Sequence, residues 1–430
     1  MYLSTIDRPR GGHGRRGVRG TVAAVGPNVL ALGAVSLLTD VSAEMVTAVL
    51  PLYFVLALHL GPAAYGLMDG LYTGATALLR LVGGYAADRT RRRKAVAGIG
   101  YGISALAKLG LMAAGSSVPA LGAVIVADRA GKGLRTAPRD ALITLSVPES
   151  VLGRAFGIHR AMDSVGAFAG PLAALGVLAA VGTTSPDAFH ALFLTSFCVA
   201  AAGLLALAGL ARDHRDERPV APGAASLKKA GELLRTAALR RLLCAAGLLG
   251  LATVGDGFVH LLLMRRQSMP MGWFPLLAVG TNLVYLLLAA PLGALADRYG
   301  RRTVLLGGYG ALLAVYLLLC GPLSGAPLTV AALCCYGAFY AATDGVLMAL
   351  AGPLLPAGLR TTGLACVQTV QALAYFGSSA AFGLAWSAWG TTAATAGAAG
   401  ATVLAVAATA VLLRDRADRI SPALQKAGPA

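Results

Sequence analysis

Long apolar stretches alternate with short polar stretches along almost the whole chain. A helix needs about 20 apolar residues to cross the hydrocarbon core of a bilayer. Twelve segments reach that length, roughly at residues 27–58, 63–87, 95–114, 117–138, 155–181, 188–211, 242–264, 273–296, 303–321, 328–352, 363–388 and 392–413. The pattern therefore predicts an all-α membrane protein with twelve transmembrane helices.

The longest polar connection divides these segments into two sets of six, and one loop repeats across the division. Residues 84–94 read GYAADRTRRRK and residues 293–305 read GALADRYGRRTVL, each after the second segment of its half. Internal repeats of this kind are typical of secondary transporters. We expect a basic tail (1–26), a six-helix bundle (27–211), a central loop (212–241), a second six-helix bundle (242–413) and a C-terminal tail (414–430).

The composition supports a membrane protein, and the distribution of the basic residues along the chain explains the high positive charge. Hydrophobic residues make up 57% of the chain and charged residues 13%, about half the share in soluble proteins. The net charge of +17 would suggest nucleic acid as a partner of a soluble protein. Of the 36 basic residues, however, only Arg265 and Arg266 fall in loops on one of the two sides. Because basic loops stay in the cytoplasm, we expect cytoplasmic termini and no nucleic-acid partner.

The repeated loop carries a family resemblance. GALADRYGRRTVL resembles the loop motif of the major facilitator superfamily, and the first copy departs from it by Arg91 in place of Gly. The resemblance covers the whole chain, since the segment count, the repeat and the central loop all agree. It implies two six-helix bundles that rock around a central cavity, and a functional monomer. SLLTDVSAEM, GKGLRTAPRDAL and GRAFGIHRAMDSVGAFAGPL look like one subfamily of exporters in the bacterial inner membrane, assigned to drugs, siderophores or metal ions.

Acidic and basic residues at the repeated loop are candidates for a cytoplasmic gate. A carboxylate there can accept charge-assisted hydrogen bonds from Arg or from a helix N-terminus in one conformation and release them in another. The other interpretation of the Arg run is simple cytoplasmic-side charge. The candidate gate residues are Asp88, Arg89, Arg92, Asp140, Asp297, Arg298 and Arg301.

Ionisable side chains within the apolar segments are costly and usually face a cavity. They concentrate in segments one, four, seven and ten, which the resemblance places around the central cavity. Lys108, in segment three, is an exception, and we expect it to snorkel or to pair with an acid. Asp69, Arg80 and Asp163 are further candidates for the cavity side. The candidate proton and substrate residues are Asp40, Glu44, Asp128, Arg129, Lys132, Asp256, His260 and Asp344, with Gln368 and Gln371 as hydrogen-bonding groups.

Two pairs of these residues have alternative roles. Asp40 and Glu44 lie four residues apart on one helix face. They can bind a proton, bind a cationic substrate or metal, or form a structural pair satisfied by Arg or by backbone. Arg129 and Lys132 lie in a stretch that resembles the family's segment-four motif, whose Arg is associated with proton transfer. The alternative is a local ion pair between Asp128 and Lys132, since those residues are also four apart.

Segment five contains Gly166, Gly170 and Pro171 in a pattern that resembles the family's antiporter motif. Ala174 and Leu175 stand where the family has two further glycines. The motif needs a kinked helix with a smooth face for close packing, although ordinary small-residue packing explains it as well. The resemblance favours export.

These features together predict a secondary transporter, most simply a proton-coupled exporter of a small organic molecule. Siderophore or metal export and proton-coupled solute uptake are the alternatives. The sequence has no Walker-type loop and no HExxH or GxSxG motif, which argues against an ATP-driven pump or a membrane enzyme. The six cysteines show no metal-type spacing, so we expect neither a cofactor nor a metal site. The expected partners are the substrate, protons and the lipid bilayer.

Overall fold

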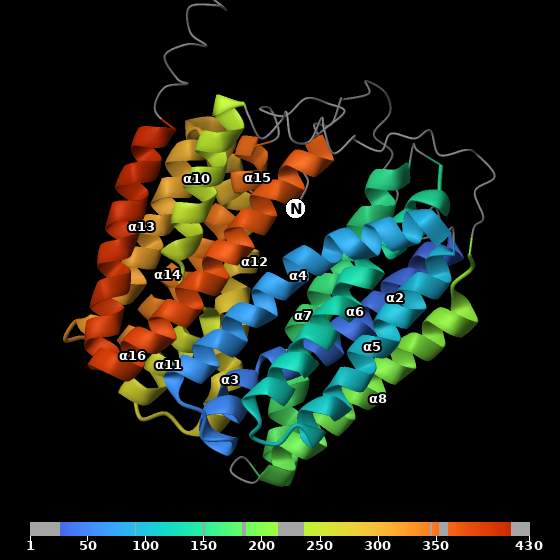
Figure 1. Ribbon diagram of the computed structural model, residues 1–430, viewed down its shortest axis with the longest axis horizontal. Coiled ribbons are helices and arrows are strands. Elements are labelled where there is room, and N and C mark those ends of the chain that lie inside the picture. The colour runs from blue at the N-terminus through green and yellow to red at the C-terminus, as the bar shows by residue number, and fades with distance from the viewer. Residues whose placement is uncertain are drawn as a thin grey trace, which may run out of the picture. The chain divides into compact units, whose positions relative to one another are not determined.

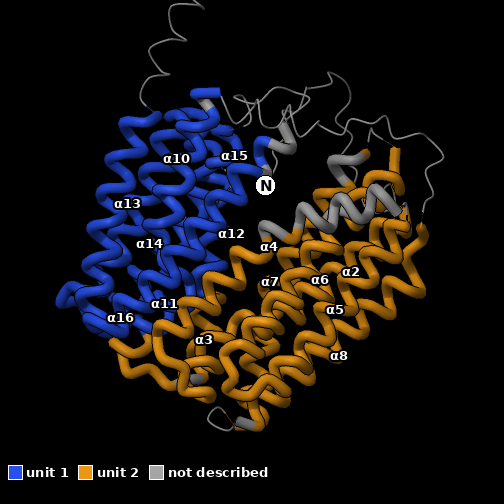
Figure 2. The backbone as a smooth tube through the Cα atoms, in the orientation of Figure 1, with its two compact units in different colours: residues 1–2, 221–263, 280–430 blue, residues 3–220, 264–279 orange. Residues whose placement is uncertain are grey.

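The computed structural model describes residues 26–90, 92–148, 151–182, 186–213, 236–344, 346–351 and 360–413. Helices make up nearly all of these residues, and no strand occurs among them (Figure 1). Contacts between residues divide the chain into two compact units (Figure 2). The N-terminal unit holds residues 3–220 and 264–279, and the C-terminal unit holds residues 221–263 and 280–430.

The N-terminal unit is a bundle in which α2 and α6 lie at the centre of the helix contacts. Helix α2 packs against α7 and α8, while α6 packs against α4 and α5. The first span is irregular beyond Thr47, where Pro51 follows a break at Ala48 and Val49. The elements are α2 (Pro27–Thr47), α3 (Leu50–Leu52), the π-helix η1 (Tyr53–Ala57), α4 (Pro62–Thr90), α5 (Arg93–Ala113), α6 (Val118–Leu145), α7 (Leu152–Val181) and α8 (Pro186–Leu210).

In the C-terminal half of the chain, one span is divided into α10 and α11 and another into α14 and α15. The long helix α16 covers the last two spans. Gly390 has φ 81° and ψ 174°, so α16 consists of two helices joined at a kink. Helices α10 and α13 pack against α16, and α13 also packs against α14. The elements of this half of the chain are α10 (Ala237–Leu251), α11 (Asp256–Arg266), the short η3 (Met271–Trp273), α12 (Phe274–Tyr299), α13 (Arg301–Cys320), α14 (Gly325–Thr343), α15 (Val346–Ala351) and α16 (Arg360–Leu412).

These helices confirm the predicted all-α membrane fold. Within the described ranges, nine helical stretches have the length and apolar composition of a membrane span, and one of them contains both halves of α16. Helices α4 and α6 account for the remaining two predicted spans. Helix α6 also runs to Leu145, beyond the expected end at residue 138. It continues because the polar side chains of that last stretch have partners inside the bundle, as described below.

Span seven is interrupted at residues 252–255, between α10 and α11. Unwound backbone at membrane depth needs hydrogen-bond partners from the protein. The N–H of Val254 donates to the Tyr316 hydroxyl over 2.9 Å, and that hydroxyl donates to the carbonyl of Ala252 over 3.2 Å. Thr402 donates to the same carbonyl over 3.3 Å. The interruption is thus stabilised by side chains, and it places Asp256 at the first position of α11.

Candidate functional site

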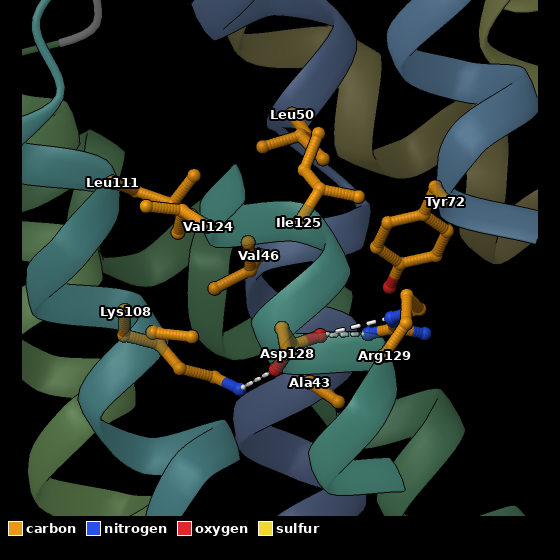
Figure 3. A pocket seen from close by; sticks show the side chains of 11 residues that line it. Ala43, Val46, Leu50, Tyr72, Lys108, Leu111, Val124, Ile125, Asp128 and Arg129 are labelled. Carbon is orange, nitrogen blue, oxygen red and sulfur yellow. Dashed lines mark hydrogen bonds and ion pairs between the residues drawn. The ribbon is translucent and has the colours of Figure 1, made fainter. Parts of the chain in front are cut away.

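A buried ion triad joins α5 and α6 in the N-terminal unit (Figure 3). Lys108 donates from Nζ to Oδ1 of Asp128 over 2.8 Å. Arg129 donates from Nε to Oδ2 of the same carboxylate over 2.9 Å, and its Nη2 donates there too. The Lys108 and Arg129 side chains are only 6% and 5% exposed. Lys108 therefore pairs with an acid, one of the two expected possibilities.

The same triad shows which cations pair with Asp128 on α6, while a role of Arg129 in proton transfer stays a prediction. Asp128 uses its two oxygens for Lys108 and Arg129. The local pair between Asp128 and Lys132, four residues apart, is therefore not the arrangement found. Sequence spacing missed the true partner because Lys108 lies on another helix, 20 residues earlier.

Arg129 extends this network to α4 and α2. Its guanidinium lies 3.6 Å from the centre of the Tyr72 ring, a cation–π contact. The Tyr72 hydroxyl lies 2.6 Å from Oγ1 of Thr47. The charged groups border a small cavity whose other walls are apolar (Figure 3). Its apolar lining includes Ala43, Val46, Leu50, Leu111, Val124 and Ile125.

Asp40 and Glu44 on α2 face the cations of α6. The Nη2 atom of Arg135 lies 3.9 Å from Oδ1 of Asp40, and its guanidinium lies 4.8 Å from the centre of the Tyr101 ring. Lys132 is close enough to both acids for electrostatic attraction. The acid pair of α2 is thus set against a cationic helix face rather than surrounded only by apolar side chains.

The polar network continues toward the end of α6. Arg139 donates to the Ser36 hydroxyl over 2.9 Å and to Oδ1 of Asp140 over 3.0 Å. On α7, Nε2 of His159 lies 3.5 Å from Oδ2 of Asp163, and Asp163 is an electrostatic neighbour of Asp40. Asp163 therefore lies near Asp40, and its predicted place on the cavity side stays a prediction.

Sequence reasoning did not include Arg135 and Arg139 among the candidate site residues. The signal was present, because Arg129, Lys132, Arg135 and Arg139 follow one another at intervals of three or four residues. That spacing places all four on one face of a helix.

The antiporter-like glycines lie directly against the two acids of α2. A Cβ atom placed at Gly166 would lie 2.8 Å from the carbonyl oxygen of Leu37 and 3.0 Å from Cβ of Asp40. One placed at Gly170 would lie 2.6 Å from Cβ of Glu44. Pro171 continues α7 without ending it. The glycines therefore allow α2 and α7 to approach closely at the level of the carboxylates.

This contact predicts the effect of a single methyl group. Gly170→Ala is expected to destabilise the folded protein by about 1–3 kcal/mol, because the added Cβ meets backbone and Cβ atoms that cannot move independently. The measurement is the thermal midpoint of the detergent-purified protein. Gly176→Ala on the same helix is the matched control, since a Cβ there meets nothing within 4 Å. Equal midpoints for the two variants would contradict the packing argument.

The C-terminal unit has its own polar site, built around Asp256. Tyr336 donates to Oδ1 of Asp256 over 2.8 Å, and Tyr340 donates to the same oxygen. Nε2 of His260 lies 3.2 Å from the Thr281 hydroxyl. Sequence reasoning found Asp256 and His260 and missed the tyrosines. The available signal was the spacing of the two tyrosines, which lie four residues apart in one apolar segment and therefore on one face of a helix.

Asp344 and the two glutamines complete the predicted residues of this unit. Tyr285 on α12 donates to Oδ2 of Asp344 over 2.9 Å. Gln368 is exposed on α16, and Gln371 is half-buried, with its backbone carbonyl packed against Gly250. Asp344 thus has the Tyr285 hydroxyl as a partner, whereas the two glutamines lie on α16.

The predicted gate residues are described only in part. Oδ1 of Asp297 lies 3.7 Å from Nη2 of Arg301, and Nη1 of Arg301 donates to the carbonyl of Ala349 on α15 over 2.7 Å. Arg298 lies over the ring of Tyr299 at 5.3 Å. In the first half, Asp140 pairs with Arg139, and Arg92 is exposed. The side chains of Asp88 and Arg89 lie outside the described residues, and the gate stays a prediction in both halves.

The sequence profile of the Major Facilitator Superfamily matches residues 32–281 and 267–429, nearly the whole chain. The chain belongs to this superfamily. It is therefore an integral membrane protein of a transporter family, and the family assignment agrees with the described helices. Within the described residues, no three His, Cys, Asp or Glu side chains form a group able to hold a metal ion.

Two relatives are similar in sequence to this chain. An uncharacterised MFS-type transporter of Methanocaldococcus jannaschii is 43% identical over 145 residues, which are 33% of this chain and 35% of that protein. An uncharacterised protein of Mycobacterium tuberculosis is 32% identical over 286 residues, 64% of this chain and 67% of its own length. The matched stretch thus spans only about a third of the archaeal relative.

Solved transporters share the fold at low sequence identity. The nucleoside transporter NupG aligns with a TM-score of 0.76 at 15% identity, covering 91% of this chain and 100% of that one. A D-xylose–proton symporter aligns with a TM-score of 0.67 at 16% identity, covering 90% and 96%. Both similarities establish the major facilitator fold for this chain.

Proposed function

We propose that the protein is a proton-coupled secondary transporter that exports a small organic molecule by alternating access. The observation that supports this most strongly is the position of Asp40 and Glu44. These acids lie between the cationic face of α6 and the glycines of α7, so their charge acts on two helix contacts at once. Costly charges at such a place fit a transport role.

Proton binding at Asp40 gives a simple coupling step. Charged Asp40 attracts Arg135 and Lys132 and holds α2 against α6. A proton on the Asp40 carboxylate removes that attraction. The free-energy difference between the two conformations of the alternating-access cycle then changes. The same proton removes the acid partner of Arg135 and leaves Lys132 with Glu44 alone. Those cations then repel one another or attract a negative group, which links the proton to the conformation.

Export is proposed over uptake because of the antiporter-like glycines of α7. Proton-coupled solute uptake and the export of a siderophore or metal remain the alternatives. The direction of transport separates uptake from the main proposal, and the identity of the transported solute separates siderophore or metal export from it. The test uses proteoliposomes that contain the protein, an internal pH-sensitive dye and a panel of labelled organic solutes. Export predicts that solute movement is coupled to proton movement in the opposite direction. Unchanged solute fluxes after collapse of the pH gradient would overturn the proposal.

The loops at Asp88 and Asp297 are proposed as the cytoplasmic gate. In the second half, Asp297 pairs with Arg301, which in turn holds the carbonyl of Ala349 on α15. This chain of contacts ties the loop between α12 and α13 to the end of span ten. Asp88, Arg89, Arg92 and Asp140 are proposed to act similarly in the first half.

We propose that a monomer lies in the bacterial inner membrane with both termini and the 212–241 loop in the cytoplasm, because the basic residues favour that side. In a variant without native cysteines, a Cys introduced at Ala225 is expected to resist a membrane-impermeant thiol reagent applied to intact cells. One introduced at the exposed Ser324, before α14, is expected to react. Mass shifts of the purified protein measure the reaction, and the reverse pattern would contradict this topology.

A further inference from the structure

The two units treat their carboxylates differently. In the N-terminal unit, Asp40, Asp128 and Asp140 each have an Arg or Lys partner within 4 Å. In the C-terminal unit, Asp256 and Asp344 have only tyrosine hydroxyls as hydrogen-bond donors, within the part of the chain that the structure describes. Among the described residues of this unit, neither carboxylate has a Lys or Arg side chain as a hydrogen-bond or ion-pair partner.

The Asp256 carboxylate is open on one side. Tyr336 and Tyr340 both donate to Oδ1. Among the described residues, no hydrogen bond or ion pair reaches Oδ2. Asp256 is exposed although its neighbours Gly255, Gly257 and Phe258 are buried. Because a lipid-facing carboxylate would be very costly, this exposed face must lie toward a space that admits polar groups.

The two tyrosines that bind this carboxylate belong to a cluster of aromatic rings on α14. The rings of Tyr336 and Tyr340 lie 5.2 Å apart, and the Phe339 ring lies 5.1 Å from that of Tyr340. The last turn of α14 then brings Tyr340 close to Asp344, which accepts the Tyr285 hydroxyl. Tyr336 is fully buried and Tyr340 is half-buried, so the Tyr340 ring is the one that a ligand beside Asp256 can contact. A carboxylate next to an accessible aromatic ring is the combination that attracts organic cations, through charge and through the ring quadrupole.

We propose that Asp256, with Tyr336 and Tyr340, binds the cationic group of the transported substrate, which we infer to be an organic amine or quaternary ammonium. This inference deepens the proposed transport function and rests on it. A metal ion fits the site less well. Ca²⁺ and Mg²⁺ need about six oxygen ligands, and the two phenols direct hydrogens, not lone pairs, at Oδ1 of Asp256. An ammonium group can approach Oδ2 without displacing either hydroxyl.

The test measures equilibrium binding to the full-length protein in detergent, without any gradient. The probes are tetraphenylphosphonium and tetraphenylborate, which have nearly the same shape and opposite charge. The wild type is expected to bind the cation at least tenfold more tightly than the anion. Asp256→Asn is expected to weaken cation binding at least tenfold, and Asp256→Glu to restore part of it. Tyr340→Leu is expected to weaken it more than Tyr340→Phe, because Phe keeps the ring.

Asp187→Asn, an exposed carboxylate at the start of α8, is the matched control and is expected to leave binding unchanged. Cation binding to Asp256→Asn as tight as to the wild type, or equal binding of both probes by the wild type, would overturn the inference. If Asp256→Asn does not elute as a single folded species, the two Tyr340 variants decide, and equal cation binding by both overturns the inference. Failure of the proton-coupling proposal looks different, since binding then persists while gradient-driven transport is absent.

Discussion

Asp40→Asn and Glu44→Gln are each expected to reduce gradient-driven transport to the level of protein-free vesicles. Exchange of substrate across the membrane without a gradient is expected to persist. The reason is that Asp40 and Glu44 are the groups whose charge acts on the cationic face of α6. An amide keeps the shape of the side chain but cannot alternate between a charged and a neutral form. The measurement compares both activities in the same proteoliposomes, over a range of pH.

Two controls separate this expectation from general damage to the bundle. Asp187→Asn removes a carboxylate at the exposed start of α8 and is expected to transport normally. The double variant Asp40→Asn with Arg135→Gln removes both partners of the 3.9 Å pair, so it is expected to fold without regaining gradient-driven transport. Normal, pH-dependent transport by both single variants would make the acids structural. The proton site would then lie at Asp256, His260 or Asp344.

Asp128→Asn is expected to be the most destabilising conservative substitution in the N-terminal unit. It removes the carboxylate shared by Lys108 and Arg129, both nearly fully buried. Removing one partner of a buried charge cluster typically costs about 3–5 kcal/mol, because an uncompensated charge remains. The thermal midpoint and the yield of folded protein in detergent measure the effect.

Lys108→Met is the informative comparison for this triad. It leaves Asp128 paired with Arg129 and replaces a buried ammonium by an apolar side chain of similar length, so the loss of stability is expected to be much smaller. Adding Lys108→Met to Asp128→Asn is expected to recover part of the lost stability, since one of two unpaired cations disappears. A larger loss in Lys108→Met than in Asp128→Asn would refute this account of the triad.

The sequence by itself determined the features that depend on local pattern. Helix number and membrane character follow from the lengths of the apolar segments, because lipid admits only backbone that satisfies its own hydrogen bonds. The family followed from the repeated loop GALADRYGRRTVL and its first-half copy. The sequence also identified the individual charged residues within the spans, since any such residue is costly and therefore stands out.

Only the tertiary structure decided which of those residues meet. Lys108 reaches Asp128 from a different helix, and the tyrosines of α14 reach Asp256 at the start of α11. Spacing along one helix reports only neighbours three or four residues away, so it suggested Asp128 with Lys132 instead. The contact of Gly166 and Gly170 with Asp40 and Glu44 depends in the same way on how α7 packs against α2. Partner choice is a property of helix packing, which brings distant residues together and which a linear pattern does not encode.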